Sequence, residues 1–421
     1  MTYDDLLKEI YSHHFRGLKP GLKRIKFLLK ELGDPHLNYD YVHVAGTNGK
    51  GSTAHYCSEI LKKDGKKVGL FTSPHLNDFR ERIRVDGEMA KKEKIEPMLE
   101  ELLKIAKTNY SSFFEITTAL AMEYFREERV DVAVLEVGMG GRWDATNIID
   151  SKISIITDIS LEHTEYLGNT IEKIAYEKAG IIKNESKVTT GTRNGALAVI
   201  KNITAQRNAR LKALNIDFQY EIKRMEIEGS EFDYINENVI RLENRLAGLK
   251  QIEDACLAVN ALEEKVKEES IKKGIKEAYA AGRFEVINPE NNQKIILDGA
   301  HNPGASLCLA ENLKKFDIKP IFVLGILKDK DYASIVRNLC PLSDLTIVAE
   351  PRSERKLDKR VLAEAAKKYT SVIISKNLKS GIEIAKSFKR DVCITGSFYL
   401  VGEAREILDL TKRGRIFLGD F

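Results

Sequence analysis

The chain has 421 residues, of which 43% are hydrophobic and 31% are charged, and its formal net charge is +4. This length predicts two domains, and the small basic excess gives no case for nucleic acid as a partner. The N-terminus lacks the apolar core of a signal peptide, and no apolar run approaches the ~20 residues that span a bilayer. We therefore expect a cytoplasmic protein with neither nucleic-acid nor membrane partners. Five scattered cysteines without a C-x-x-C pair argue against a zinc site or a disulfide framework.

The first part of the chain alternates between expected strands and helices. The strands are 42–45, 67–72, 130–137 and 153–159, and the helices are 52–63, 95–107, 113–126 and 171–182. The run 130–137 is almost continuously apolar, which is typical of a strand buried on both faces. This alternation predicts an α/β fold with a doubly wound, mainly parallel sheet of the P-loop type.

The pattern changes at residues 215–245, where period-two alternation indicates a small antiparallel side sheet. Helices return at 251–266 and 271–281, and Asn288–Asn292 is a cluster of chain breakers typical of a linker. Five more strands follow, at 294–297, 320–324, 345–349, 371–374 and 392–395, and a helix at 399–408 closes the series. We predict a larger domain over 1–284 and a smaller, Rossmann-like α/β domain over 285–421.

A glycine-rich turn follows the first expected strand. The segment Gly46-Thr-Asn-Gly-Lys-Gly-Ser52 leads from an apolar run into a helix-compatible stretch. Backbone N–H groups in such a turn cradle phosphate oxygens, and Lys50 adds a positive charge, so the turn predicts nucleoside triphosphate binding. It departs from G-x-x-x-x-G-K-[ST] at Val44 and Gly51. A glycine-rich turn without a ligand is the alternative.

Three strands of the same sheet are expected to end in polar side chains. Glu136 closes the apolar run, where a carboxylate is costly unless it is paired or bound to metal. It is placed to hold Mg²⁺ beside phosphates, and the alternatives are that it caps a nearby helix or pairs with Arg142. Ser73 and His163 follow two other strands, so a hydroxyl, a carboxylate and an imidazole should reach one edge. Taken alone, a loop histidine is more typical of a surface or hydrogen-bonding residue.

The second domain begins with a polar strand end and a hinge arginine. Asp298 and His301, in Asp298-Gly-Ala-His-Asn-Pro303, could bond a ribose, a base or a phosphate, whereas Asn302-Pro303 is also an ordinary helix start. Arg283 lies at the expected hinge and could reach a phosphate when the domains close. A solvated linker charge is the alternative reading of Arg283.

Together these segments resemble the folylpolyglutamate synthase/dihydrofolate synthase family, within the Mur-ligase group of ATP-dependent amide ligases. The resemblance covers nearly the whole chain, and it explains both departures of the glycine-rich turn. The matching segments, in order, are Gly46–Ser52, Ser73–Leu76 with Glu81–Arg84, Glu136–Arg142 with Asp144–Asn147, Glu177–Gly180, Asp298–Pro303 and Gly396–Leu400.

The resemblance implies a role for each matching residue. Residues that would contact ATP are Asn48, Gly49, Lys50, Gly51, Ser52, Asp254, Arg283, Asp298 and His301. Residues that would ligate Mg²⁺ are Ser73, Glu136, His163 and Lys178, the last as a carbamate that helps to hold a second Mg²⁺. Lys50, His163 and Lys178 would be the catalytic set. The pterin end of the substrate would lie near Gly21, Leu22, Ser112, Trp143, Asp144 and Ala145.

Some positions depart from the family pattern. Lys250 and Asp254 stand where the family commonly has His and Asn, which leaves the role of Asp254 open. Glu162 replaces an Asp before the metal-binding histidine. Neither the Glu162 change nor Ala281, in place of a Pro, threatens the chemistry.

The resemblance implies a monomeric ligase that attaches L-glutamate to the γ-carboxylate of a folate through an acyl phosphate. Dihydropteroate is the alternative acceptor, used alone or in addition. A ligase for cell-wall precursors is a further alternative, against which the form of Asp298–Pro303 and Gly51 argue. A P-loop regulatory protein is the last alternative, and it would not need Ser73, Glu136, His163 and Lys178 to converge.

Overall fold

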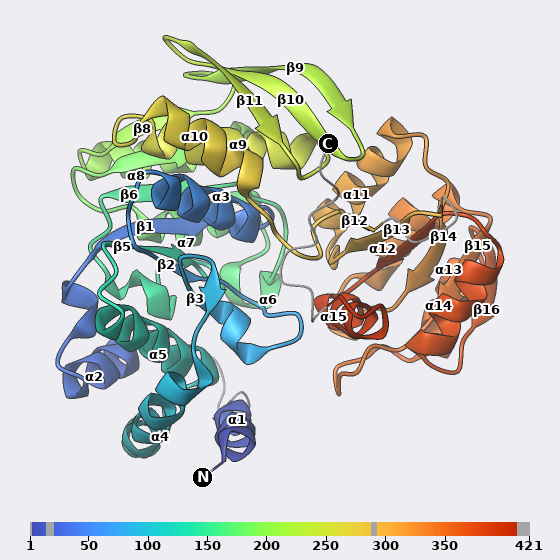
Figure 1. Ribbon diagram of the computed structural model, residues 1–421, viewed down its shortest axis with the longest axis horizontal. Coiled ribbons are helices and arrows are strands. Elements are labelled where there is room, and N and C mark those ends of the chain that lie inside the picture. The colour runs from blue at the N-terminus through green and yellow to red at the C-terminus, as the bar shows by residue number, and fades with distance from the viewer. Residues whose placement is uncertain (1, 14–20, 288–292, 411–421) are drawn as a thin grey trace.

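Two α/β units lie side by side in the structure (Figure 1). The computed structural model describes residues 2–13, 21–287 and 293–410, so the expected linker Asn288–Asn292 lies outside the described residues. Within the described parts, the first unit holds an eight-stranded and a three-stranded sheet, and the second holds a six-stranded sheet.

The large sheet has the strand order β4-β3-β2-β5-β1-β6-β7-β8. Its strands are β1 (Asp40–Ala45), β2 (Val68–Phe71), β3 (Ile83–Val85), β4 (Glu88–Met89), β5 (Val132–Glu136), β6 (Ile153–Ile156), β7 (Lys187–Thr190) and β8 (Arg210–Ala213). All neighbouring strands pair in parallel except β2 with β3 and β3 with β4. Because β1 lies between β5 and β6, the glycine-rich turn after β1 is flanked by Glu136 and by the loop after β6.

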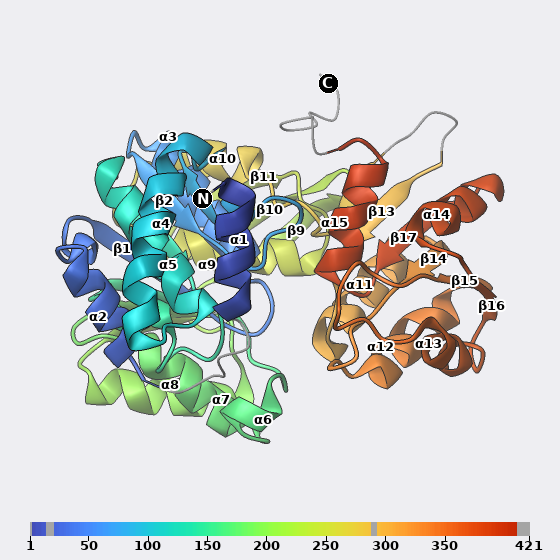
Figure 2. The ribbon, with the colours of Figure 1, turned by 90° about the horizontal axis from the view of Figure 1, so that it is seen from below.

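Helices cover both faces of the large sheet, as the continuous burial of β1 and β5 requires. Val42 and Val134 face α3 (Lys50–Lys63), α9 (Leu249–Leu262) and α10 (Glu268–Glu277). Tyr41 and Leu135 face the layer of α1 (Tyr3–Ser12), α2 (Lys23–Glu31), α4 (Lys92–Asn109) and α5 (Phe113–Glu127). Figure 2 shows the second layer in front of the sheet.

Helices α6 (Thr164–Leu167), α7 (Ile171–Lys178) and α8 (Asn194–Gln206) follow the central strands. The predicted helix 171–182 is shorter than expected. Helix α7 ends at Lys178 and a 3₁₀ turn, Ala179–Ile181, follows. The break coincides with a close approach, because a Cβ on Gly180 would collide with the backbone of Arg142. Other 3₁₀ turns are Pro35–Leu37, Phe79–Arg82, Ala145–Ile148 and Cys340–Leu342.

The predicted antiparallel side sheet is present. It consists of β9 (Gln219–Glu226), β10 (Gly229–Ile235) and β11 (Val239–Asn244), with β10 in the middle. Phe232, Tyr234 and Leu242 turn toward the core beside α3 and α9. The side sheet therefore extends the first unit and covers that helix layer, as Figure 1 shows at its top.

The second unit has the strand order β12-β13-β17-β14-β15-β16. The strands are β12 (Glu285–Ile287), β13 (Ile295–Asp298), β14 (Ile321–Leu324), β15 (Leu345–Val348), β16 (Ser371–Ile374) and β17 (Val392–Thr395), all parallel except β12. Its helices pack on opposite faces (Figure 2): α11 (Pro303–Lys315), α12 (Tyr332–Leu339) and α13 (Lys359–Ala366) on one, α14 (Leu378–Ser387) and α15 (Phe398–Ile407) on the other.

These sheets confirm the predicted fold class. Within the described residues the backbone passes from the first unit to the second once, between α10 and β12, and the boundary expected after residue 284 lies at the end of this connection. Gly282 and Phe284 both have left-handed φ angles there, of 68° and 48°. All five cysteines are free. None of the described helices has the length and apolar character needed to cross a membrane.

Candidate active site between the two units

The phosphate loop, residues 46–52, connects β1 to α3. Gly49 is the residue that precedes α3, with a φ of 85°, and no side chain caps the first turn of the helix. A Cβ on Gly46 would collide with Thr157, and a Cβ on Gly49 would collide with the carboxylate of Asp254. Thr157 and Asp254 thus pack tightly against the loop. The backbone N–H groups in the first turn of α3 remain available to bind an anion.

Two lysines meet at the carbonyl oxygen of Gly46. Lys50 Nζ donates to it over 3.1 Å and to the Thr47 carbonyl over 2.9 Å. Lys178 Nζ donates to the same oxygen over 2.6 Å and is almost completely buried. Burial, and then the charge of Lys50, lower the pKa of Lys178 to about 7. A substantial fraction of this amine is therefore neutral at pH 7.

Glu136 ends β5 and faces the phosphate loop. Its side chain is buried, and Oε2 accepts a hydrogen bond of 2.9 Å from the backbone N–H of Ser73. Burial raises the pKa of Glu136, and the charges of Lys50 and Arg283 oppose that shift. The alternative pairing with Arg142 is not seen, since Arg142 lies 4.0 Å from the ring centroid of Tyr176.

The remaining predicted metal residues lie around the same edge. Ser73 and His163 both line the cleft described below, and His163 directly precedes α6. Burial lowers the pKa of His163 to about 4, so its imidazole is neutral at pH 7. Among the described residues, no three His, Cys, Asp or Glu side chains form a metal-binding group. The predicted set contains only two such side chains, Glu136 and His163.

Arg283 lies at the junction of the two units. A Cβ on Gly51 would be 3.5 Å from Arg283 Nη2 and 3.6 Å from Glu136 Oε2, so both side chains border the phosphate loop. The guanidinium of Arg283 lies 4.3 Å from the ring centroid of Phe398. Asp298 accepts from the backbone N–H groups of Phe284 and Ala300, both over 2.8 Å. Asp298 thereby fixes the backbone next to Arg283.

The carboxylate of Glu162 contacts three side chains of the second unit. Its Oε1 accepts from Asn302 Nδ2 over 3.2 Å and lies 3.5 Å from His301 Nε2 and 3.8 Å from Lys330 Nζ. Asn302 caps α11 by accepting from the Ala305 N–H, which confirms the helix-start interpretation. The cross-domain bonds of Asn302 are additional, and sequence reasoning missed them.

Asp254 is completely buried beneath Gly49. Its Oδ1 lies 2.7 Å from Lys250 Nζ, one helical turn earlier on α9. Burial lowers the pKa of Lys250, but the carboxylates of Asp254, Asp158 and Glu253 together outweigh burial and raise that pKa. The two departures from the family pattern therefore form one buried ion pair under the phosphate loop.

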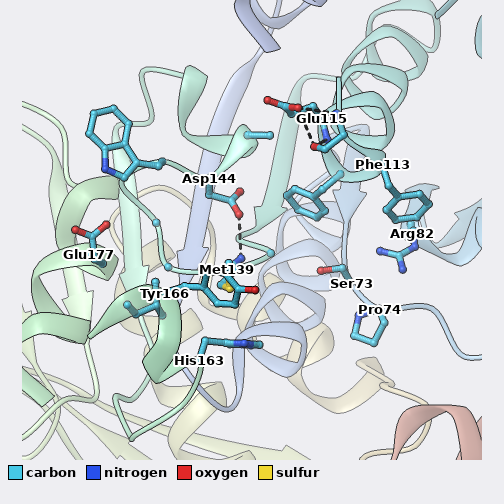
Figure 3. A pocket seen from close by; sticks show the side chains of 18 of the residues that line it. Ser73, Pro74, Arg82, Phe113, Glu115, Met139, Asp144, His163, Tyr166 and Glu177 are labelled. Atoms are coloured by element: carbon cyan, nitrogen blue, oxygen red, sulfur yellow. Dashed lines mark hydrogen bonds between the residues drawn. The ribbon is translucent and has the colours of Figure 1, made fainter. Parts of the chain in front are cut away.

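A cleft of about 550 Å³ opens beside these groups and is lined by both units. Of the predicted substrate residues, five line it: Gly21, Ser112, Trp143, Asp144 and Ala145. Leu22 instead packs against the hydrophobic core of the α1–α5 layer. Figure 3 shows the Asp144 carboxylate bonded to the Met139 backbone, with Tyr166, His163 and Ser73 around the cavity.

Several lining residues were not predicted as site residues. Arg82 is buried, donates to His75 Nδ1 over 2.8 Å and lies over the ring of Phe113. Lys330, Arg355 and Tyr399 line the cleft from loops or helix starts after β14, β15 and β17. The signal that could have found these three is position, because ligands in such sheets bind beyond the carboxyl ends of parallel strands.

Comparison with known proteins assigns the family. Residues 44–262 match the model of the Mur ligase middle domain, and residues 282–398 match the Mur ligase glutamate ligase domain. The dihydrofolate synthase/folylpolyglutamate synthase of Bacillus subtilis (strain 168) is 33% identical over 429 residues, which cover 97% of this chain and 99% of the relative. The chain belongs to the folylpolyglutamate synthase/dihydrofolate synthase family. The predicted resemblance and the predicted ligase class are confirmed.

Other relatives of this family differ in length. A probable bifunctional folylpolyglutamate synthase/dihydropteroate synthase of Halobacterium salinarum is 35% identical over 96% of this chain but only 51% of the relative. The chain therefore spans about half the length of that protein.

Solved folylpolyglutamate synthase structures share the fold. That of Thermotoga maritima has 39% identity and a TM-score of 0.86, covering 97% of both chains. E. coli FolC in complex with DHPP and ADP has 27% identity and a TM-score of 0.87, covering 97% of this chain and 98% of FolC.

Proposed function

We propose that this chain uses ATP to attach L-glutamate to the γ-carboxylate of tetrahydrofolate, with dihydropteroate as a second candidate acceptor. The observation that carries the proposal is the continuity of two sites. Glu136 lies beside Gly51 of the phosphate loop and accepts from the backbone N–H of Ser73, and Ser73 lines the 550 Å³ cleft that both units line. That FolC binds DHPP together with ADP supports a pterin compound and a nucleotide as neighbouring ligands.

The first step would activate the acceptor. An oxygen of its carboxylate attacks the γ-phosphorus of ATP, an O–P bond forms, the bond to the β-phosphate oxygen breaks, and ADP leaves. Lys50 and the first amides of α3 would offset the negative charge of the phosphates. Arg283, which lies beside Gly51 at the junction of the two units, would contribute a guanidinium able to make two hydrogen bonds to a phosphate.

The second step would form the amide. The neutral amino group of glutamate attacks the carbonyl carbon of the acyl phosphate, the C–N bond forms, and phosphate leaves with the C–O bond electrons. The amine proton passes to solvent or phosphate. The cations Lys330 and Arg355 line the cleft from the second unit and are suited to the carboxylates of the incoming glutamate.

Water would destroy the acyl phosphate, so the cleft must close around it. The contacts of Glu162 with His301, Asn302 and Lys330 join the two units beside the phosphate loop. These contacts would hold the closed arrangement during both steps.

The residues at the strand ends fit Mg²⁺. One buried carboxylate with a neighbouring hydroxyl, completed by nucleotide phosphates and water, is the ligand set that Mg²⁺ prefers. Ser73 and Glu136 would hold the ion of MgATP, with His163 and Lys178 near a second one. When bound, Mg²⁺ supplies positive charge to the phosphates.

We also propose that Lys178 carries a carbamate. Its neutral amine can add to the carbon of CO₂, which forms an N–C bond and releases one proton. The product is an anion, so it would replace a buried cation by an oxygen ligand next to the phosphate loop. The low pKa of Lys178, about 7, favours this reaction near neutral pH.

A coupled assay of ADP release tests the proposed function. Purified protein is given MgATP and L-glutamate with tetrahydrofolate, with dihydropteroate, or with no acceptor. We expect turnover only when acceptor and glutamate are both present. Turnover with dihydropteroate and none with tetrahydrofolate would overturn the first choice. Strong ATP hydrolysis without acceptor would instead support a P-loop switch.

A further inference from the structure

A buried histidine lies in the middle of the large sheet, one strand away from Glu136. His43 is on β1, between Leu135 of β5 and Ser154 of β6, and its side chain is completely buried. Its Nε2 lies 2.8 Å from Thr146 Oγ1. Its Nδ1 is buried and has no hydrogen-bond partner within the described residues. An imidazole buried on a central strand is held rigidly. The hydrogen bond of His43 to Thr146 leads toward the residues that line the cleft.

A second hydrogen bond links Thr146 to Asp144. Thr146 Oγ1 donates to Asp144 Oδ1 over 2.6 Å, since an ionised carboxylate only accepts. The threonine oxygen must then accept from His43, which assigns the imidazole hydrogen to Nε2. Asp144 Oδ1 also accepts from the Thr146 N–H over 3.0 Å. The three side chains form a directed chain of hydrogen bonds.

Asp144 connects this hydrogen-bonded chain to the cleft. It lines the cleft, and its Oδ2 accepts from the Met139 N–H over 2.9 Å. Met139 belongs to the glycine-rich wall of residues 138–141, all of which line the same cavity. The carboxylate thus accepts from the Thr146 N–H and hydroxyl at Oδ1 and from the Met139 N–H at Oδ2, and its direction depends on the Thr146 hydroxyl.

We propose that His43 is a positioning residue that fixes Asp144, through the Thr146 hydroxyl, and with it the acceptor-binding wall of the cleft. The identity of the ligand as a pteridine acceptor rests on the proposed function, whereas the positioning of Asp144 and Met139 does not. A locked second layer of this kind holds a binding group within the narrow limits that recognition needs.

The chain offers its own reporter for acceptor binding. Trp143 is the single tryptophan of the sequence, precedes Asp144 and lines the cleft with half of its surface exposed. Its fluorescence would be titrated with tetrahydrofolate and with dihydropteroate in the full-length protein. The variants are Thr146→Val, Thr146→Ser and His43→Leu. The matched control is Thr118→Val, which removes a buried hydroxyl that has no hydrogen-bond partner within the described residues.

Thr146→Val and His43→Leu should weaken acceptor binding on the order of tenfold, because a buried polar group loses its partner. The KM for ATP should stay within about twofold, and Thr146→Ser and Thr118→Val should bind like the parent protein. Equal losses of acceptor and ATP affinity would show a merely structural role. Unchanged acceptor binding in Thr146→Val would also overturn the proposal.

Hydrogen exchange separates this proposal from the proposed function. The Met139 amide should exchange faster in Thr146→Val and His43→Leu than in Thr118→Val, with or without ligand, because Asp144 no longer holds it. If the parent protein binds neither acceptor, the proposed function fails but the exchange result still decides the positioning. Unchanged protection of Met139 in both variants would overturn it.

Discussion

Asn302 Nδ2 donates to Asn48 Oδ1 over 3.0 Å, so the residue that caps α11 in the second unit is bonded to the phosphate loop of the first. Asn48 is itself held by Asp158, whose Oδ1 accepts from the Asn48 N–H over 2.5 Å. The start of α11, the phosphate loop and the loop after β6 therefore form one hydrogen-bonded junction.

Asn302→Asp should weaken this junction and leave α11 intact. An aspartate still caps the helix, but it cannot donate to Asn48, and it places a second negative charge beside Glu162. We expect kcat/KM for ATP to fall on the order of tenfold with little change in thermal stability. The control is Asn377→Asp at the exposed start of α14, which should be neutral. Equal activity of the two variants would contradict the assigned bond.

Gly49→Ala should cost more than a left-handed φ alone explains. Gly65 has nearly the same φ, 87°, but a Cβ there meets nothing within 4 Å. Gly65→Ala therefore measures the backbone cost, on the order of 1 kcal/mol. Gly49→Ala adds a collision with Asp254, so it should unfold at a lower denaturant concentration and lose nucleotide affinity. Equal midpoints for the two variants would show that Asp254 moves aside freely.

Lys250→Met should destabilise the protein strongly, because it leaves the Asp254 carboxylate buried without its cation. Loss of one partner of a buried pair costs about 3–5 kcal/mol. The double variant Lys250→Met/Asp254→Asn removes both charges and should recover most of that loss. Denaturant unfolding of the single and double variants measures the coupling. Additive losses would mean that the 2.7 Å contact contributes nothing.

Lys178→Ala should lose ligation and regain part of it with small carboxylates such as acetate, if the native side chain acts as a carbamate. The ion would occupy the space left by the side chain and restore an anionic oxygen. The measurement is turnover across an acetate series, with chloride at equal ionic strength as the control. Full activity without any added carboxylate would remove Lys178 from the mechanism.

His43 should make folding sensitive to acid. Burial lowers the pKa of His43 from its ordinary value of 6.5 to about 3. Below pH 6.5 His43 binds a proton in the unfolded chain but stays neutral in the folded chain. The contribution of neutral His43 to the free energy of unfolding is therefore complete above pH 6.5 and is lost as the pH falls toward 3.

His43→Gln removes this dependence. Between pH 6 and 4 its free energy of unfolding should fall less steeply than that of the parent protein, by up to ~1.4 kcal/mol per pH unit. Urea unfolding followed by Trp143 fluorescence at several pH values gives both slopes. Parallel curves would mean that His43 takes up its proton in the folded state.

The sequence predicts most of the central sheet because these strands combine apolar runs with polar ends. Local sequence pattern alone predicts a strand at 130–137 and a glycine-rich turn after the first strand. The structure has β5 and the phosphate loop at these two places. Strands β7 and β8 were missed, because Lys187–Thr190 and Arg210–Ala213 carry few large apolar residues and are strands through their sheet partners. The hairpin β3–β4 is too short for a periodic signal.

The candidate site also contains residues that the sequence predicts and residues that it does not. Glu136 was predicted at the end of its strand from local pattern, whereas Asp144 was predicted through the resemblance alone and lines the cleft. Asn302 and Lys330 depend on how one unit docks on the other, which no local pattern encodes. Leu22 was predicted at the substrate through the resemblance alone, and the structure packs it, partly buried, against the hydrophobic core of the α1–α5 layer.

Within the described residues the backbone passes only once between the two units, and this has a mechanical consequence. Any rotation of the second unit would take place about residues 278–284, so Arg283 would lie beside the pivot and move little. Lys330 and Arg355 lie on the loops that follow β14 and β15, further from the pivot, and would move further. Such a hinge would keep the arginine next to the phosphate loop while the rim of the cleft opens for exchange of substrate and product.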